Sequence, residues 1–246
     1  MMTDGMLGVA EPPSHSEDDF RDQLMGILGH DLRNPLSAIT ALAQVTMQRD
    51  DLPGEVRERL AQMDRAAKRS LAMIESLLDF SESRLKGALP IRPMTARLAD
   101  IAARVIEELS IANPRRIILL ELRGREPFEL DPVRIEQVLS NLVGNALVHG
   151  AADTPIEVFV DVREHEALLA VTNRGPVIPP ERARSLFQPF TQGGAAHDSA
   201  GDRPRGLGLG LYIVRQIVTA HGGTVTVDSS AAVGTTFVVR LPRRAR

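Results

Sequence analysis

Apolar residues recur at spacings of three and four over two long stretches near the start of the chain. The first stretch begins at Asp18 and ends before Pro53-Gly54, a dipeptide typical of turns. The second runs from Glu55 to Lys86, and its apolar spine alternates steps of four and three, as in a heptad repeat. This spine consists of Val56, Leu60, Met63, Ala67, Ser70, Ile74 and Leu77. The pattern predicts two long helices that form an antiparallel hairpin.

A hairpin of two helices cannot cover its own apolar seam. Pairing of two hairpins into a four-helix bundle is the usual solution, so we expect a homodimer. The alternative is a hairpin that packs against a second domain of the same chain. Residues 1–17 are polar and contain Pro12-Pro13, and we expect them to be a disordered lead-in.

From Gly87 to Pro93 the helical pattern breaks, and shorter alternating elements follow it. Helical spacing recurs over residues 96–112, 131–149 and 207–221, and strand patterns occur over 116–122, 156–162, 167–172, 224–228 and 235–241. The chain is therefore expected to be an α+β protein. The hairpin would span residues 18–87, and an α/β sandwich with helices on one face of its sheet would span 88–246.

Composition narrows the class of protein. The net charge of −3 offers no broad basic field, which argues against nucleic acid as a partner. The absence of Cys removes disulfides and thiolate metal sites. No apolar run approaches the roughly 20 residues of a membrane span, and the first residues do not resemble a signal sequence. We therefore expect a cytoplasmic protein with no direct membrane span.

The first candidate for chemistry is His30, in the run from Gly29 to Leu36 within the first predicted helix. The neighbouring Asp31 could accept the proton of one ring nitrogen, which would leave the other nitrogen as a nucleophile. Asn34 lies four residues on, hence on the same helix face, where its amide could orient a water molecule. Taken alone, a surface histidine beside an aspartate is more often inert.

The second candidate is the polar face of the helix predicted from Asp131, an N-cap residue, to the stop at Gly150. Asn141, Asn145 and His149 recur there at a spacing of four. Amide oxygens suit a hard Mg²⁺ ion that takes most of its other ligands from phosphate and water. The alternative is an ordinary solvated helix face, although charged residues would be more usual on such a face.

A third group of residues could surround a nucleotide base. The strand that ends at Asn173 runs into a turn with Gly175, where an amide could recognise the edge of adenine and the glycine would let the backbone approach the ring. Thr235 lies at the start of the last predicted strand, which could close over the base.

Three glycines, Gly206, Gly208 and Gly210, precede the last amphipathic helix. Glycines at a helix N-terminus present free N–H groups and a positive dipole to phosphate. A dinucleotide-binding fingerprint would need a strand directly before them. Here the polar segment 191–205 precedes them, and we expect that segment to be a mobile lid.

In this order and spacing, the segments resemble the motif series of the sensor histidine kinases. The matching segments are residues 30–36 (H box), 131–150 (N box), 171–179, 206–211 and 234–237 (glycine boxes) and 186–190 (F box). The resemblance covers about residues 20–241. It implies a dimerisation and phosphoacceptor hairpin followed by an ATP-binding domain similar to those of gyrase, Hsp90 and MutL.

The resemblance also implies roles for the residues of the H box. His30 would be the phosphoacceptor and Asp31 its base. Asn34 matches the position that helps to dephosphorylate the partner, which is the receiver domain of a response regulator. The donor would be ATP with Mg²⁺. Only about 17 residues precede the hairpin, so either a separate sensor protein detects the stimulus or the chain is part of a longer protein.

In the ATP-binding domain, Asn145 matches the Mg²⁺ ligand of the family, Asn141 a phosphate contact and His149 the ring that flanks the nucleotide. Asn173 stands where the family most often has an adenine-recognising Asp. An Asn oxygen can still accept a hydrogen bond from the adenine amino group, so we expect ATP binding with altered affinity. Val148 occupies a position that is frequently basic.

Two other functions remain open at this point. An ATPase of the gyrase or Hsp90 class would explain residues 95–241 but would leave His30 and the hairpin without a purpose. A phosphotransfer or scaffold protein with a degenerate nucleotide domain is the second alternative, and Asn173 is the feature that favours it.

Overall fold

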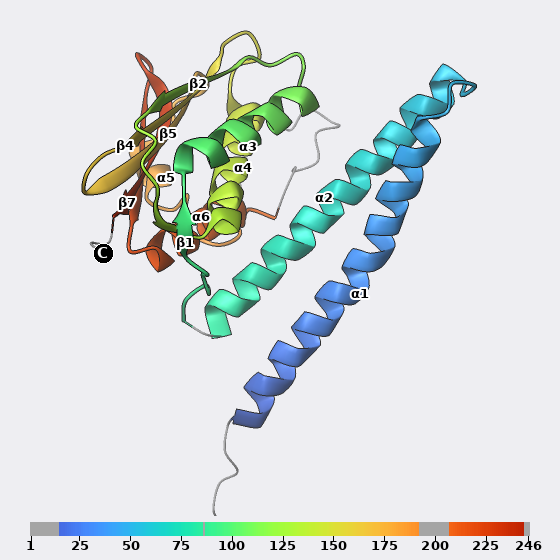
Figure 1. Ribbon diagram of the computed structural model, residues 1–246, viewed down its shortest axis with the longest axis horizontal. Coiled ribbons are helices and arrows are strands. Elements are labelled where there is room, and N and C mark those ends of the chain that lie inside the picture. Colours follow the sequence, from blue (N-terminus) through green and yellow to red (C-terminus); the bar gives the residue numbers. More distant parts are fainter. Residues whose placement is uncertain (1–14, 86, 192–206, 244–246) are drawn as a thin grey trace, which may run out of the picture. The chain divides into compact units, whose positions relative to one another are not determined.

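The computed structural model describes residues 15–85, 87–191 and 207–243, with side chains from residue 31 onward (Figure 1). The chain divides into two units, with residues up to Ser81 in the first and residues from Glu82 in the second. The predicted lead-in lies mostly outside the described residues, as do nearly all of the predicted lid and Gly206.

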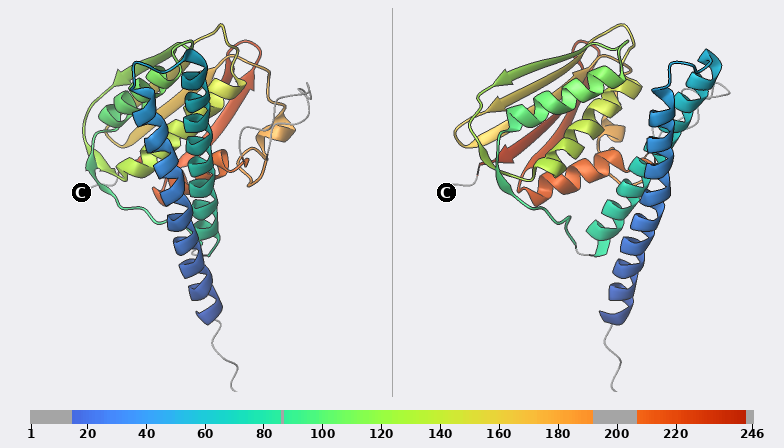
Figure 2. Two further views of the ribbon diagram at one scale, coloured as in Figure 1. Left: turned by 90° about the vertical axis from the view of Figure 1, so that its right-hand side faces the viewer. Right: turned by 45° about the vertical axis from the view of Figure 1, so that its right-hand side comes forward.

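The first unit is the predicted hairpin. Helix α1 (His15–Met47) begins slightly earlier than expected and continues through Pro35, and α2 (Gly54–Leu85) returns beside it (Figures 1 and 2). Arg57 fixes the connection, because its guanidinium donates to the carbonyls of Met47 and Arg49 at 2.5 and 2.8 Å. The carbonyl of Met47, the last residue of α1, thereby gains a partner that the helix itself does not supply.

Small residues allow the two helices to approach each other. Ala43 on α1 and Ala67 on α2 are both 4% exposed. Close by, the Nε2 atom of Gln44 donates to Oδ1 of Asp64 at 3.1 Å. Several large apolar residues of the hairpin stay exposed, including three of the predicted spine, and they are Leu32, Ile39, Leu42 and Val45 on α1 and Val56, Met63 and Leu77 on α2.

The second unit is built on a five-stranded sheet with the strand order β2-β4-β5-β7-β6. The strands are β2 (Ile118–Arg123), β4 (Ile156–Val162), β5 (Glu166–Asn173), β6 (Thr224–Ser230) and β7 (Gly234–Pro242), all within two residues of their predicted positions. Strands β2 and β4 are parallel, and the other neighbours are antiparallel. The register places Asn173 of β5 opposite Thr235 of β7.

Three helices cover one face of this sheet, as expected: α3 (Leu98–Ala112), α4 (Pro132–His149) and α6 (Gly210–Ala220) (Figure 2). The alternation along β4 fits this arrangement, because Ile156, Val158 and Val160 are buried while Glu157 between them is exposed. The last helix begins three residues later than predicted, at Gly210. The glycine segment before it is therefore not helical at residues 207–209.

Three short elements had no counterpart in the predicted pattern. Strands β1 (Met94–Ala96) and β3 (Phe128–Leu130) pair in an antiparallel two-stranded sheet, and α5 is the single turn Pro180–Ala183. Three or four residues are too few to show a period. Within the described ranges, none of the helices combines the length and apolar character that a bilayer span requires.

Candidate functional site

Helix α4 has the ends that its sequence predicts. The side chain of Asp131 accepts a hydrogen bond from the backbone N–H of Arg134, Pro132 follows the cap, and the N–H of Gly150 donates to Ala146 at 2.8 Å. Its buried stripe consists of Ile135, Val138, Leu139, Leu142, Val143 and Ala146. These contacts fix the rotation of the helix, so its polar stripe faces away from the core.

Asn141 on that polar stripe lies against the start of α6. A Cβ atom added to Gly210 would lie 2.9 Å from Oδ1 of Asn141, so only glycine fits at this position without displacing the amide. The predicted phosphate contact and the last glycine of the predicted phosphate loop are therefore neighbours. Asn145, one turn further along α4, is half-buried.

Gly208 allows the preceding segment to fold back on itself. Its φ angle is +70°, and a Cβ atom there would lie 2.8 Å from the carbonyl oxygen of Thr191. Both the left-handed conformation and the close approach require glycine. Thr191 and Gly208 are thus held together next to the N-terminus of α6. The first N–H groups of a helix can bind an anion.

Asn173 and Thr235 form the other half of the site. They are strand partners, so their side chains lie side by side on the same face of the sheet, and they are 6% and 5% exposed. The Thr235 hydroxyl lies 2.7 Å from Oγ of Ser229, which in turn accepts a hydrogen bond from the backbone N–H of Ile178.

The turn after β5 is pressed against the end of α4. A Cβ atom on Gly175 would lie 2.6 Å from the carbonyl oxygen of His149, and the N–H of Ala151 donates to the carbonyl of Arg174 at 2.6 Å. Nδ2 of Asn173 makes a longer hydrogen bond, 3.4 Å, to that same carbonyl. The structure thus brings Asn173, Gly175 and His149 together.

His149 ends α4 beside Arg182 of α5. His149 keeps part of its surface exposed, but its partial burial lowers the pKa of the ring below the ordinary value of 6.5, and the positive charge of Arg182 lowers this pKa further. The ring is therefore neutral at pH 7. A neutral ring suits a residue that packs on an apolar base. No sequence signal pointed to Arg182, because the Gly175 turn creates its proximity to His149.

The described residues contain no group of three His, Cys, Asp or Glu side chains that could hold a metal ion by themselves. The amide oxygens of Asn141 and Asn145 nevertheless fit Mg²⁺, which prefers oxygen ligands and retains several water or phosphate ligands. A metal at this site would depend on the phosphate groups of a nucleotide.

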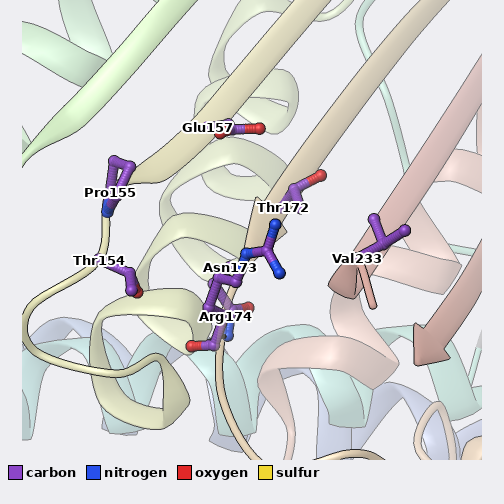
Figure 3. Close-up of a pocket in the computed structure, with 7 residues that line it drawn as sticks. All are labelled: Thr154, Pro155, Glu157, Thr172, Asn173, Arg174 and Val233. Carbon is purple, nitrogen blue, oxygen red and sulfur yellow. Dashed lines mark hydrogen bonds between the residues drawn. The ribbon is translucent and has the colours of Figure 1, made fainter. Parts of the chain in front are cut away.

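A shallow pocket of about 200 Å³ lies on the far side of the same strand ends (Figure 3). Glu157 and Thr172, which are strand partners, point away from the three helices, and the rest of the lining consists of Thr154, Pro155, Asn173, Arg174 and Val233. The pocket is smaller than the usual 300–1,000 Å³ of a ligand site. Asn173 therefore borders this pocket, whereas Thr235 is not among its lining residues.

The H box lies in the other unit. His30 falls within α1, but its side chain is outside the described residues. Asp31 and Asn34 are exposed on the same helix. The structure therefore places the predicted nucleotide residues that it describes, all but Gly206, within the second unit and the predicted phosphoacceptor segment in the first.

Two family models match the chain. Residues 20–85 match the His Kinase A (phospho-acceptor) domain. Residues 130–245 match the Histidine kinase-, DNA gyrase B-, and HSP90-like ATPase. The first match contains His30, and the second contains α4, β5, α6 and β7.

Several curated proteins are similar over most of the chain. The Bacteriophytochrome of Pseudomonas aeruginosa is 31% identical over 92% of this chain and 30% of its own length. The Probable sensor histidine kinase TcrY of Mycobacterium tuberculosis is 31% identical, over 89% of this chain and 45% of its own. The Adaptive-response sensory kinase SasA of Synechococcus sp. is 34% identical, over 91% of this chain and 60% of its own length. The chain thus spans less than two thirds of each relative.

Solved structures share the fold. Full-length ShkA in complex with AMPPNP has a TM-score of 0.67 at 21% identity, and the match covers 91% of this chain and 46% of the ShkA chain. The Acinetobacter baumannii histidine kinase AdeS has a TM-score of 0.59 at 21% identity, and the match covers 88% of this chain and 98% of AdeS. At these identities the likeness concerns the fold alone. With a phosphoacceptor domain and an ATPase domain both matched, in that order, and sensor kinases among its relatives, the chain belongs to the sensor histidine kinases.

Proposed function

We propose that this chain is the catalytic core of a two-component sensor kinase, which uses ATP and Mg²⁺ to phosphorylate His30. One observation carries the proposal above all others. The pairs Asn141 with Gly210 and Asn173 with Thr235 are far apart in the sequence, yet each pair meets within the second unit. They supply the polar groups that phosphate and a purine base need.

Within this proposal, the residues of the second unit hold the nucleotide. Asn173 and Thr235 contact the base, Gly175 gives it room and the neutral His149 ring flanks it. Asn141 contacts phosphate, while the backbone N–H groups of the glycine segment, predicted as Gly206, Gly208 and Gly210, would donate to the phosphate oxygens. Asn145 would hold Mg²⁺, which neutralises phosphate charge when bound.

In the proposed reaction, one ring nitrogen of His30 attacks the γ-phosphorus of ATP. The bond from that phosphorus to the bridging oxygen breaks, and ADP leaves with the bond's electron pair. Asp31 accepts the proton from the other ring nitrogen. Positioning and neutralisation of charge supply most of the acceleration in phosphoryl transfer, so the chain needs no further nucleophile.

The phosphoryl group would then pass to an aspartate in the receiver domain of a separate response regulator. Asn34 lies one helical turn after His30 and is exposed, so its amide could place a water molecule for dephosphorylation of that regulator. Since ATP is the donor, the proposal places both domains in the cytoplasm. A partner protein or a further part of a longer chain would detect the stimulus.

A homodimer is part of the same proposal. Leu42, Val45 and Met63 of the hairpin are 68%, 65% and 58% exposed, which is unusual for large apolar side chains on neighbouring helices. A second copy of the hairpin would cover them in a four-helix bundle.

Incubation with γ-labelled ATP and Mg²⁺ tests the function. The proposal requires a label that is labile in acid and stable in alkali, and that is lost in His30→Gln while ATP binding persists. ATP turnover without label would favour the ATPase of the gyrase or Hsp90 class. Absence of nucleotide binding would favour the phosphotransfer or scaffold protein.

A further inference from the structure

The last turn of α2 belongs to the second unit, although the rest of this helix lies in the first. The division falls between Ser81 and Glu82, within the continuous helix that ends at Leu85. Ser83, which lies in this last turn, is 5% exposed. A hydroxyl in such a buried position needs a hydrogen-bond partner, and a partner shows what the turn contacts.

One partner of Ser83 is Tyr212 of α6. Oγ of Ser83 lies 3.0 Å from the phenolic oxygen of Tyr212, across 129 positions of sequence, and either oxygen can be the donor. Tyr212 is 6% exposed, and the guanidinium of Arg215, one helical turn further on, lies 5.9 Å from the centre of its ring. The tyrosine is therefore held both at its ring and at its hydroxyl.

Tyr212 lies in the first turn of α6, at the end that is proposed to bind phosphate. The helix begins at Gly210, and Gly210 lies against the amide of Asn141. A shift of this turn would move the first N–H groups of α6 and disturb the contact with Asn141. Such N–H groups stabilise a phosphate best where they already point at its oxygens before it binds. The position of this turn therefore matters to the proposed site.

The chain that follows α2 is fastened to the other helix of the proposed site. Leu89 is 2% exposed, and the backbone N–H of Arg92 donates to Oδ2 of Asp131 at 2.7 Å. Asp131 caps α4, which carries Asn141 and Asn145. The last turn of α2 and the chain after it thus contact both α6 and the cap of α4.

These contacts suggest a role for Ser83 that rests on the proposed function. We infer that Ser83 is a positioning residue of the ATP site, which acts through its hydrogen bond to Tyr212 and holds the first turn of α6 where its N–H groups meet the phosphates. In this role Ser83 needs no contact with the nucleotide. The bond raises ATP affinity because the turn is in place before ATP binds, so that binding does not have to order it.

Titration calorimetry of the full chain with ATP and Mg²⁺ tests this role in Ser83→Ala, in Tyr212→Phe and in the double variant. Each single substitution removes one hydroxyl of the pair, and Tyr212→Phe keeps the ring. We expect each to weaken ATP binding by about three- to tenfold, which corresponds to one hydrogen bond. The double variant should bind ATP no more weakly than the single variants, because both substitutions remove the same bond.

Ser76→Ala is the matched control on the same helix. The hydroxyl of Ser76 donates to the carbonyl of Ala72 at 2.8 Å, within α2, so its loss should leave ATP affinity within about twofold. Circular dichroism shows which variants are folded. Ser83→Ala and Tyr212→Phe remove the bond from opposite sides, so either variant tests the role if the other does not fold.

The outcomes are separable from those of the proposed function. Folded variants whose ATP affinity falls by less than about threefold would overturn the role of Ser83 and leave the kinase proposal standing. Losses that add in the double variant would also overturn this role, because the two hydroxyls would then act independently. If the unsubstituted protein binds ATP without labelling His30, the kinase proposal fails, and the titrations still decide the role of Ser83. Failure of the unsubstituted protein to bind ATP would overturn both.

Discussion

The backbone N–H of Asp131 donates a hydrogen bond to Nε2 of His221 at 3.0 Å, across 90 positions of sequence. Nδ1 of the same ring lies 2.8 Å from the carbonyl oxygen of Ile217 and donates to it. Both ring nitrogens are satisfied only in the neutral form with the proton on Nδ1. The ring therefore joins the start of α4 to the end of α6, the two helices that carry the proposed nucleotide site.

Replacing His221 should weaken the second unit. His221→Phe keeps the ring but leaves the buried N–H of Asp131 without an acceptor, which costs about 1–3 kcal/mol of unfolding free energy. Denaturant unfolding measures the loss. His165→Phe is the matched control, because the side chain of His165 is 89% exposed, and it should change stability little. Equal effects of the two substitutions would contradict the assigned role of His221.

The contact between Asn141 and Gly210 leads to a second prediction. Gly210→Ala would place a methyl group 2.9 Å from Oδ1 of Asn141 and push the amide out of position. We expect ATP affinity to fall by about tenfold, equivalent to about 1.4 kcal/mol. Titration with ATP measures the change.

Gly144→Ala provides a control for the general effect of alanine in a helix. A Cβ atom on Gly144 meets nothing within 4 Å, so alanine should raise the unfolding free energy by about 0.5–1 kcal/mol. Gly210→Ala should not give this gain. If both variants were stabilised and Gly210→Ala bound ATP normally, the proposed crowding at Asn141 would be wrong.

His149 gives the second unit a pH dependence. Its pKa lies below 6.5 in the folded protein because of burial and the nearby Arg182. The unfolded chain therefore binds this proton more readily, and stability is lost as the pH falls below about 6.5, while nothing is lost above it. His149→Gln should lose less stability than the unsubstituted protein between about pH 7 and pH 5.

An NMR titration of the ring protons tests the cause of that pKa directly. Arg182→Gln should raise the pKa of His149, and burial should still hold it below its ordinary value. An unchanged pKa of His149 in Arg182→Gln would mean that Arg182 does not contribute and that burial alone lowers this pKa.

Much of the fold was predictable because local signals mark its longer elements. Asp131-Pro132 and Gly150 define both ends of α4, and the apolar spacing between them defines its buried side. The H box, glycine boxes and N box identify the family for the same reason. Such signals depend on neighbours in the sequence, so they need no knowledge of the tertiary structure.

Other features depend on contacts that only the folded chain creates. The pairing of β1 with β3 is missing from the prediction because each strand has three residues. His221 follows a helix and gives no sign that it accepts a hydrogen bond from Asp131. Arg116 reaches the end of α4 from another segment, where it donates to the carbonyls of Leu147 and Gly150.

The proposed role of Asn145 predicts a loss of chemistry without a loss of assembly. Asn145→Ala removes the amide oxygen expected to hold Mg²⁺, and we expect labelling of the protein by γ-labelled ATP to disappear. The substitution lies in the second unit, so the dimer should persist in sedimentation. Mg²⁺-dependent labelling that survives in Asn145→Ala would show that the metal ligand has been assigned wrongly.

The exposed apolar residues of the hairpin predict the dimer interface. Leu42 is 68% exposed, so Leu42→Lys should not disturb the hairpin itself but should place a charge in the interface between two copies. We expect the dissociation constant of the dimer to rise by at least about tenfold, as measured by analytical ultracentrifugation. Ile111→Lys is the matched control, because Ile111 is 75% exposed on α3 in the other unit. A dimer that tolerates Leu42→Lys as well as Ile111→Lys would mean that the two hairpins meet elsewhere, or not at all.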